Sequence, residues 1–206
     1  MERKSKVARK TNETDIKVRW VIDGEGTYNV STSIPFFDHM LHLFSKHGLF
    51  DLEVQAKGDT DVDHHHTVED VGIAMGKAFR EAIADLQGLK RYGFAVTPMD
   101  EALCMIAIDI SGRPALVWKG RIQGTTGTFD AGVVKEFFKA FVNEAKVTLH
   151  MNMLYGENLH HKIEAIFKSF GRALKDATRK DKRIKGQGGE RWNENPRLQE
   201  RPTRPT

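Results

Sequence analysis

The sequence lacks what a disulfide-rich or membrane-spanning protein needs. It has one cysteine among 206 residues, so no disulfide framework can form within the chain, and the apolar run around Cys104 predicts a buried, inert thiol. No stretch approaches the roughly 18 apolar residues of a membrane span, and no apolar segment follows the basic N-terminus. We therefore expect a globular protein of the reducing cytoplasm.

Acidic residues outnumber basic ones in the part of the chain that should fold. The net charge is +4, but residues 1–10 carry five Lys and Arg against one acid, and residues 175–206 carry ten against five. The body between them is therefore acidic, and a basic face for nucleic acid is not expected. The two basic ends are predicted to be solvated, as an N-terminal arm over residues 1–8 and a flexible tail over residues 181–206.

The hydrophobic pattern predicts strand, strand, helix, strand, helix, and this order occurs twice. The first series has strands over 15–22 and 27–33, joined as a hairpin, a helix over 35–47, a strand over 49–56 and a helix over 68–86. The second has strands over 101–110 and 115–123, a helix over 131–143, a strand over 146–153 and a helix over 159–177. We predict an α+β fold of two duplicated half-repeats, 9–94 and 95–180, forming one unit with two antiparallel-rich mixed sheets and helices packed against them.

The final helices of the two series share a sequence motif. A shift of 95 residues superposes identical residues in the pairs His65/His160, His66/His161, Glu69/Glu164, Gly76/Gly171 and Ala78/Ala173. Neighbours such as Thr67 and Lys162 differ, so the agreement is concentrated in rare, chemically reactive side chains. We infer an internal duplication of a half-domain.

The duplicated residues have the spacing of metal ligands. His65 and His66 stand four and three residues before Glu69, so the three side chains share a helix face. Imidazole and carboxylate donors suit a borderline divalent ion such as manganese, iron or zinc, whereas calcium and magnesium prefer oxygen ligands. The absence of thiolates disfavours structural zinc. One such motif is usually a solvated helix start, but two matching copies predict metal binding.

The helices that precede these motifs offer further donors. His39 stands in the first of them, and Glu136 occupies the matching position in the second series, so each series gains one more ligand. His64 is predicted to be exposed and not to bind metal. His47, directly before Gly48, is either a cation at the C-terminal end of its helix or a substrate contact.

Six segments resemble imidazoleglycerol-phosphate dehydratases and occur in the family's order. They are RKTNET from Arg9, FDHML from Phe37, HHTVEDVG from His65, MDEA from Met99, SGRP from Ser111 and LYGEN from Leu154. The resemblance runs nearly unbroken from Arg9 to about Ala177.

The resemblance implies a hydro-lyase of histidine biosynthesis that converts D-erythro-imidazole glycerol phosphate to imidazole acetol phosphate. It also implies two manganese ions in each active site, which stabilise the imidazolate form of the substrate ring. The ligands that it implies are His39, His65, His66, Glu69, His160, His161 and Glu164, with Glu136 where many relatives have histidine. Family members form trimers that assemble into a large octahedral shell with manganese at the subunit contacts, so a homo-oligomer is expected.

The resemblance further implies the residues that act on the substrate. Glu13 matches the family's acid/base glutamate, and the phosphate-binding positions are matched by Arg91, Arg113 and Lys168, with His47 as a further substrate contact. Two features depart from the family. Its short closing segment with Ser and Lys is replaced here by residues 186–206, and His42 and Leu43 stand where many relatives have an acid and a glutamine.

Two other functions would use similar residues. A dinuclear metallohydrolase that cleaves a phosphate ester also needs two metals, arginines and carboxylates. In a metal-storage protein or a metal-assembled oligomer, the paired helices would bind ions without catalysis.

Overall fold

The computed structural model describes residues 2–184 of the chain, so most of the predicted tail lies outside the described residues. The first half contains β1 (Lys4–Lys10), β2 (Thr14–Val21), β3 (Tyr28–Ser31), α1 (Pro35–Gly48), β4 (Asp51–Gly58) and α2 (His65–Ala82). The second half contains β5 (Tyr92–Met99), β6 (Ala102–Asp109), β7 (Ala115–Lys119), α3 (Gly132–Ala145), β10 (Thr148–Tyr155) and α4 (Leu159–Thr178). A short two-stranded sheet, β8 (Thr125–Thr126) with β9 (Phe129–Asp130), precedes α3.

The two main sheets have the same topology. Their strand orders are β1-β2-β4-β3 and β5-β6-β10-β7. In each sheet the first three strands are antiparallel, and the last strand, β3 or β7, pairs in parallel with its neighbour. This confirms the predicted α+β class, the mixed sheets and the duplication.

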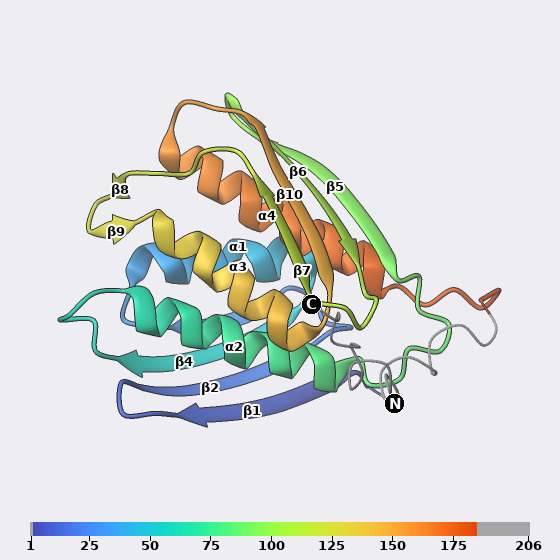
Figure 1. The fold of residues 1–206 in the computed structure, drawn as a ribbon. Coiled ribbons are helices and arrows are strands. Elements are labelled where there is room, and N and C mark those ends of the chain that lie inside the picture. The colour runs from blue at the N-terminus through green and yellow to red at the C-terminus, as the bar shows by residue number, and fades with distance from the viewer. Residues whose placement is uncertain (1, 185–206) are drawn as a thin grey trace, which may run out of the picture.

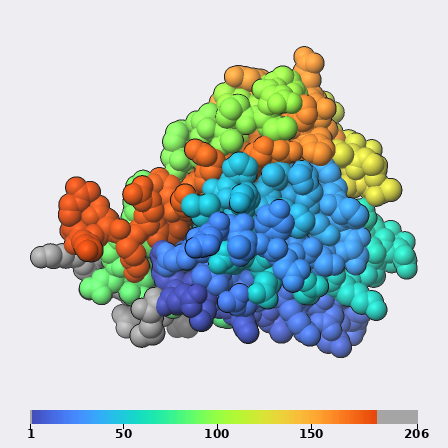
Figure 2. Space-filling model, turned by 180° about the vertical axis from the view of Figure 1, so that it is seen from behind, coloured from blue at the N-terminus to red at the C-terminus, as the bar shows by residue number. Residues whose placement is uncertain are grey.

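The four helices lie between the two sheets (Figure 1). Alternating apolar residues on the strands face this layer, as shown by Ile16, Val18 and Trp20 of β2, which are at most 2% exposed. From behind, the first half fills the lower part of the molecule and the strands of the second half lie above it (Figure 2). The core therefore belongs to both halves and joins them into one unit.

Helix pairing crosses between the halves. α1 packs against α4 and α2 against α3, so each pair combines one helix from each half. Glycines bring the helices close together. A Cβ atom on Gly72 or Gly76 of α2 would come within 2.6 Å of a backbone oxygen of α3, and one on Gly171 of α4 would come as close to Phe44 of α1.

Three sequence predictions need correction. The hairpin predicted over 15–33 is wrong, because β3 pairs in parallel with β4 and β2 pairs with β1 and β4. The solvated N-terminal arm is wrong for residues 4–8, which belong to β1 with Val7 half-buried and Ser5 buried. Strand β5 was missed, and the predicted boundary after residue 94 falls inside it.

None of the helices within residues 2–184 is long and apolar enough to cross a membrane. The cytoplasmic location stays a prediction. Cys104 is buried on β6, as its apolar surroundings indicated, and burial raises the pKa of its thiol to about 12.

Candidate metal centre

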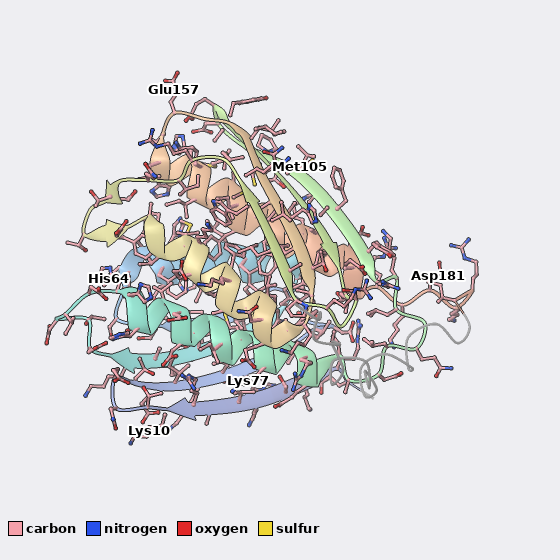
Figure 3. All side chains as sticks on the ribbon, viewed as in Figure 1. Lys10, His64, Lys77, Met105, Glu157 and Asp181 are labelled. Atoms are coloured by element: carbon pink, nitrogen blue, oxygen red, sulfur yellow. The ribbon has the colours of Figure 1, made fainter. Side chains whose placement is uncertain are left out.

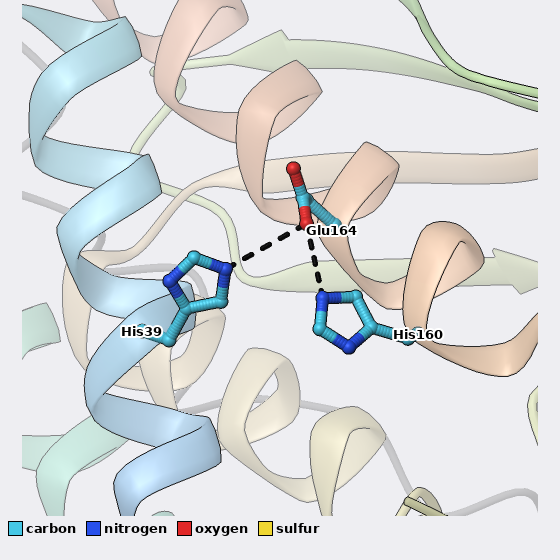
Figure 4. Close-up of side chains that lie close together, drawn as sticks. All are labelled: His39, His160 and Glu164. Atoms are coloured by element: carbon cyan, nitrogen blue, oxygen red, sulfur yellow. Dashed lines mark hydrogen bonds and ion pairs between the residues drawn. The ribbon is translucent and has the colours of Figure 1, made fainter.

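Helices α1 and α4 bring three of the predicted ligands together (Figure 4). Donor atoms of His39, His160 and Glu164 all lie within 4.8 Å of one another. Oε2 of Glu164 is 3.1 Å from Nε2 of His160 and 3.7 Å from Nε2 of His39. Two imidazole nitrogens and a carboxylate oxygen form a donor set that suits a borderline divalent cation.

Local structure fixes the positions of these side chains. Pro35 occupies the first turn of α1, which places His39 in the next turn. Asn158 caps α4, since its side-chain oxygen accepts hydrogen bonds from the backbone N–H groups of His160 and His161. His160 and Glu164 then share a helix face at a spacing of four residues.

Glu164 is held in its charged form inside the protein. Its side chain is 8% exposed, and its Oε1 lies 2.5 Å from Nζ of Lys168. Burial on its own would raise the pKa of Glu164, but hydrogen bonds and charge from Lys168, together with His160, outweigh burial and lower it. The carboxylate is therefore ready to accept a cation.

The first copy of the motif has a looser arrangement. Nε2 of His65 lies 3.5 Å from Oε2 of Glu69, and both side chains are more than 40% exposed. Glu136 of α3 forms an ion pair with Lys139 at 3.2 Å. Among the described residues, His65, Glu69 and Glu136 do not form a group of three donors within 4.8 Å of one another. The assignment of Glu136 as a ligand stays a prediction.

The two remaining histidines each contact an orienting carboxylate. Nδ1 of His161 is 2.7 Å from Oε2 of Glu101, and Nδ1 of His66 is 2.9 Å from Oδ2 of Asp59. Since a carboxylate only accepts hydrogen bonds, each ring donates from Nδ1, which leaves Nε2 as the atom that could bind a metal. Nε2 of His161 lies 3.7 Å from Oδ2 of the exposed Asp100. Within one chain, neither histidine joins the group around Glu164.

Glu13 lies near the first copy of the motif. It is exposed in the loop between β1 and β2. The pKa of His66 is raised, first by its hydrogen bond with Asp59 and to a smaller extent by the charge of Glu13. Thr14, the next residue along the chain, donates a hydrogen bond to Asp70, which directly follows Glu69, so the loop that carries Glu13 lies beside the first copy of the motif.

The predicted phosphate contacts fall into two groups. Arg91 donates to both oxygens of Asp109, at 2.6 and 3.1 Å, and Arg113 lies 3.8 Å from the same carboxylate. Lys168 instead pairs with Glu164. His47 lines a cavity together with Arg172 of α4, the helix that carries Lys168. Burial lowers the pKa of His47, and the positive charges of Lys168 and Arg172 lower it further.

Two cavities lie near the ends of the helices. One of about 390 Å³ is lined by His47, Arg172 and Arg179, with Phe94 and Val96 of β5 at its border. Its cationic lining suits an anion. A larger cavity, of about 830 Å³, lies near Arg3 and the ends of α2 and α4 and contains none of the donor histidines.

Some side chains behave differently from the sequence predictions. His64 is half-buried and stacks on Phe129 at 5.9 Å instead of being exposed. His42 stacks on Tyr28 at 4.3 Å. In Figure 3, His64 and Glu157, which stand just before α2 and α4, lie toward the same end of the molecule.

The sequence patterns did not identify the carboxylates that bond to the histidines and arginines of the site. Asp59, Glu101, Asp70 and Asp109 hold histidines or arginines, but they stand far from those partners in the sequence or outside the helix pattern. The one available signal was their presence in or beside the segments that carry the family resemblance, as for Glu101 in MDEA and Asp70 in HHTVEDVG.

Comparison with known proteins identifies a single family. The family model of imidazoleglycerol-phosphate dehydratase matches residues 32–174. The imidazoleglycerol-phosphate dehydratase of Acetivibrio thermocellus is 55% identical over 187 residues, 90% of this chain and 96% of the relative, and that of Bacillus velezensis is 54% identical over 185 residues, 89% and 95%. The crystal structure from Staphylococcus aureus has a TM-score of 0.77 at 38% identity and covers 86% of this chain and 99% of that one. The structure from Pyrococcus furiosus, in complex with (S)-C348, has a TM-score of 0.77 at 34% identity and covers 89% and 99%.

Proposed function

Because this chain belongs to the imidazoleglycerol-phosphate dehydratase family, which are hydro-lyases of histidine biosynthesis, we propose that it dehydrates D-erythro-imidazole glycerol phosphate through a dimanganese site. The observation that carries this proposal is the group of His39, His160 and Glu164, whose donor atoms lie within 4.8 Å in a duplicated His-His-x-x-Glu framework.

The reaction needs groups that move protons. Loss of water breaks the C–O bond at the carbon next to the imidazole ring and the C–H bond at the following carbon. Electrons of the ring expel the hydroxyl group, a base removes the proton to give an enol, and the enol tautomerises to the ketone. Glu13 is our candidate for the base, since it is exposed, lies near His66 and can carry the proton to the product.

The chain's own donors fit a metal centre. His39, His160 and Glu164 would hold one ion, and the first copy would contribute His65, Glu69 and Glu136 to the other, with His66 and His161 completing the sites. When bound, manganese would supply Lewis-acid stabilisation of the charge that develops on the substrate ring.

Cationic residues near these donors support binding of a phosphate. Arg91 and Arg113 present guanidinium groups around Asp109, while Lys168 and His47 lie beside Glu164 and the cationic cavity. A guanidinium fork matches two phosphate oxygens. We assign all four to the phosphate of the substrate, with the two groups coming from different chains of the proposed oligomer.

A homo-oligomer would bring together donors that one chain keeps apart. His66 and His161 bond to carboxylates through Nδ1, so Nε2 of each ring could bind a metal shared with a neighbouring copy. The outer face of the second sheet exposes Tyr92, Phe94 and Leu154, each at least 44% accessible. We therefore propose trimers that assemble into a shell, with metal at the subunit contacts.

Turnover and particle size test the proposal together. Purified protein should convert imidazole glycerol phosphate to imidazole acetol phosphate only when manganese is present. Chelator or mild acid should produce a smaller particle, a trimer, and added manganese should restore both size and activity. Release of inorganic phosphate would indicate a hydrolase instead. Stoichiometric metal binding without turnover of either kind would indicate storage or assembly, and a fully active metal-loaded monomer would rule out sites at subunit contacts.

A further inference from the structure

We propose that Asp70 is a positioning residue, which ties the loop carrying Glu13 to the helix that carries the first metal motif. This inference rests on the proposed function, because it assumes that Glu13 acts on the substrate. It assigns a role to Arg9 and Thr14 of RKTNET and to Asp70 of HHTVEDVG, which neither the proposed metal site nor the proposed phosphate site uses.

Asp70 is bonded to both strands that flank the Glu13 loop. Its Oδ1 accepts hydrogen bonds from Nε and Nη2 of Arg9, at 3.0 and 2.8 Å, near the end of β1. Its Oδ2 accepts a hydrogen bond from Oγ1 of Thr14, the first residue of β2, at 2.5 Å. Three charge-assisted hydrogen bonds to one carboxylate fix the two ends of the loop relative to α2.

The loop between these ends is braced from inside. Oγ1 of Thr11 accepts hydrogen bonds from the backbone N–H groups of Glu13 and Thr14, at 3.2 and 3.0 Å. The backbone N–H of Thr11 in turn donates to the carbonyl of Thr14 at 2.9 Å. The backbone of Glu13 therefore moves with Thr14, and Thr14 is attached to Asp70.

The attachment is specific to this loop. Within the described residues, all hydrogen bonds between residues 9–14 and α2 end on Asp70. Asp70 directly follows Glu69, so the carboxylate that anchors the loop and the carboxylate that would bind metal share one turn of α2. The position of Glu13 is thereby set relative to the metal donors.

The second half shows that the fold itself does not need this network. The residue equivalent to Asp70 in α4 is Ala165, which is fully buried, and the first residue of β6, equivalent to Thr14, is Ala102. Thr97 of β5 stands where β1 has Arg9. At this position, a carboxylate that bonds to both strands flanking the loop therefore occurs only in the half that carries Glu13, which is expected if it serves catalysis rather than folding.

Asp70→Asn tests the proposal in the manganese-loaded enzyme. It keeps the shape of the side chain but removes the charge that binds Arg9. We expect kcat to fall by about ten- to a hundredfold, the range for a misplaced catalytic group, with KM and manganese content unchanged. In the Glu13→Gln background the same substitution should have no further effect, because both changes disable one group. Asp15→Asn, which removes an exposed ion pair with Lys10 on the same hairpin, should keep kcat.

Hydrogen exchange gives a readout that does not depend on turnover. The backbone amides of Glu13 and Thr14 should exchange faster in Asp70→Asn than in the parent protein, while amides of β6 should not change. Thr14→Ala, which carries the residue of the second half, provides a second variant if Asp70→Asn does not fold. Equal losses of kcat in the parent and Glu13→Gln backgrounds, or unchanged exchange at Glu13 and Thr14, would overturn the proposal. If Glu13→Gln is fully active, the catalytic role of Glu13 fails, and the exchange rates alone decide whether Asp70 holds the loop.

Discussion

The two copies of the metal motif are alike in sequence and different in structure. In α4, Glu164 is 8% exposed and pairs with Lys168, whereas in α2, Glu69 is 41% exposed and the position equivalent to Lys168 is Ile73. The second copy thus holds its carboxylate in place, and the first lacks the cation that would do so. Duplicated ligands are arranged alike only where the residues around them are duplicated too.

The loops that reach the histidines differ in the same way. Glu101 directly precedes β6 and bonds to His161, and Glu13 occupies the corresponding place directly before β2. Asp59 takes the place on His66 that Glu101 takes on His161. Among the described residues, the Glu13 carboxylate makes no hydrogen bond or ion pair, which agrees with our proposal that it transfers a proton, whereas its counterpart Glu101 has a structural role.

Replacement of the two motif glutamates should have the largest effects, and the two copies should differ in one of them. Glu164→Gln and Glu69→Gln should each lower manganese content and activity together, since each removes an anionic ligand. Only Glu164→Gln should also destabilise the metal-free fold, by about 1–3 kcal/mol, because Lys168 would lose its partner in a site where it is 15% exposed. Metal analysis and urea unfolding of the metal-free proteins measure both effects. Normal metal loading and full turnover in both variants would contradict the ligand assignment.

Glu13→Gln tests whether the two loops differ in function. We expect turnover to fall by about a hundredfold or more, with manganese binding intact, because the variant loses a proton-transfer group but no ligand. Steady-state kinetics and metal analysis of the same preparation measure this. A variant that fails only through loss of metal would show that Glu13 is a ligand, as its counterpart Glu101 is not.

The orienting carboxylates should give smaller effects. Glu101→Gln and Asp59→Asn should each weaken manganese affinity by about 10- to 100-fold, the usual effect of removing a carboxylate that orients a metal-binding histidine. The loss should be larger for Glu101, because its Oε1 also accepts hydrogen bonds from the backbone of Glu157 and Asn158, whereas Oδ1 of Asp59 is buried without a partner among the described residues. Calorimetric titration with manganese ranks the two, and the reverse order would refute this explanation.

The smallest expected effect is on histidine titration in the metal-free protein. Hydrogen bonds to Glu101 and Asp59 raise the pKa of His161 and His66, while burial lowers that of His47. The first two rings should therefore titrate above about pH 6.5 and His47 below it. The stabilisation from the His161–Glu101 pair is complete below the unfolded pKa and disappears as pH rises through the raised folded value. NMR titration of Glu101→Gln should show His161 shifted back down, and an unshifted His161 would exclude Glu101 as the cause.

Sequence periodicity predicted the helices well and the strand pairing poorly. α1, α3 and α4 begin within about one residue of their predicted starts, because their apolar faces repeat along the helix. The pairing of β3 with β4 could not be read locally, because a turn rich in glycine predicts a hairpin whichever strand is the real partner. β1 was missed because its exposed positions carry Lys4, Lys6 and Lys10, which resemble a solvated arm.

The sequence predicted which residues are candidate ligands, but not which of them lie next to one another in space. The 95-residue shift identified both motifs, and the match between the preceding helices identified His39. That His39 meets Glu164, and not Glu69 of its own half, depends on packing between helices, which no local pattern contains. The structure brings these three donors together, but all the ligand assignments, the acid/base role of Glu13 and the phosphate contacts stay predictions.

Because α1 packs against α4, the three donors His39, His160 and Glu164 come from both halves of the chain, and neither half contains all of them. His39 comes from one half and Glu164 from the other, so a half-repeat on its own could assemble such a group only by exchanging helices with a second molecule. Residues 83–91 connect α2 to β5 and so join the two halves covalently, which makes the contact between α1 and α4 intramolecular. The donors then meet at an effective concentration set by the connection, and formation of the group no longer depends on how much protein the cell contains.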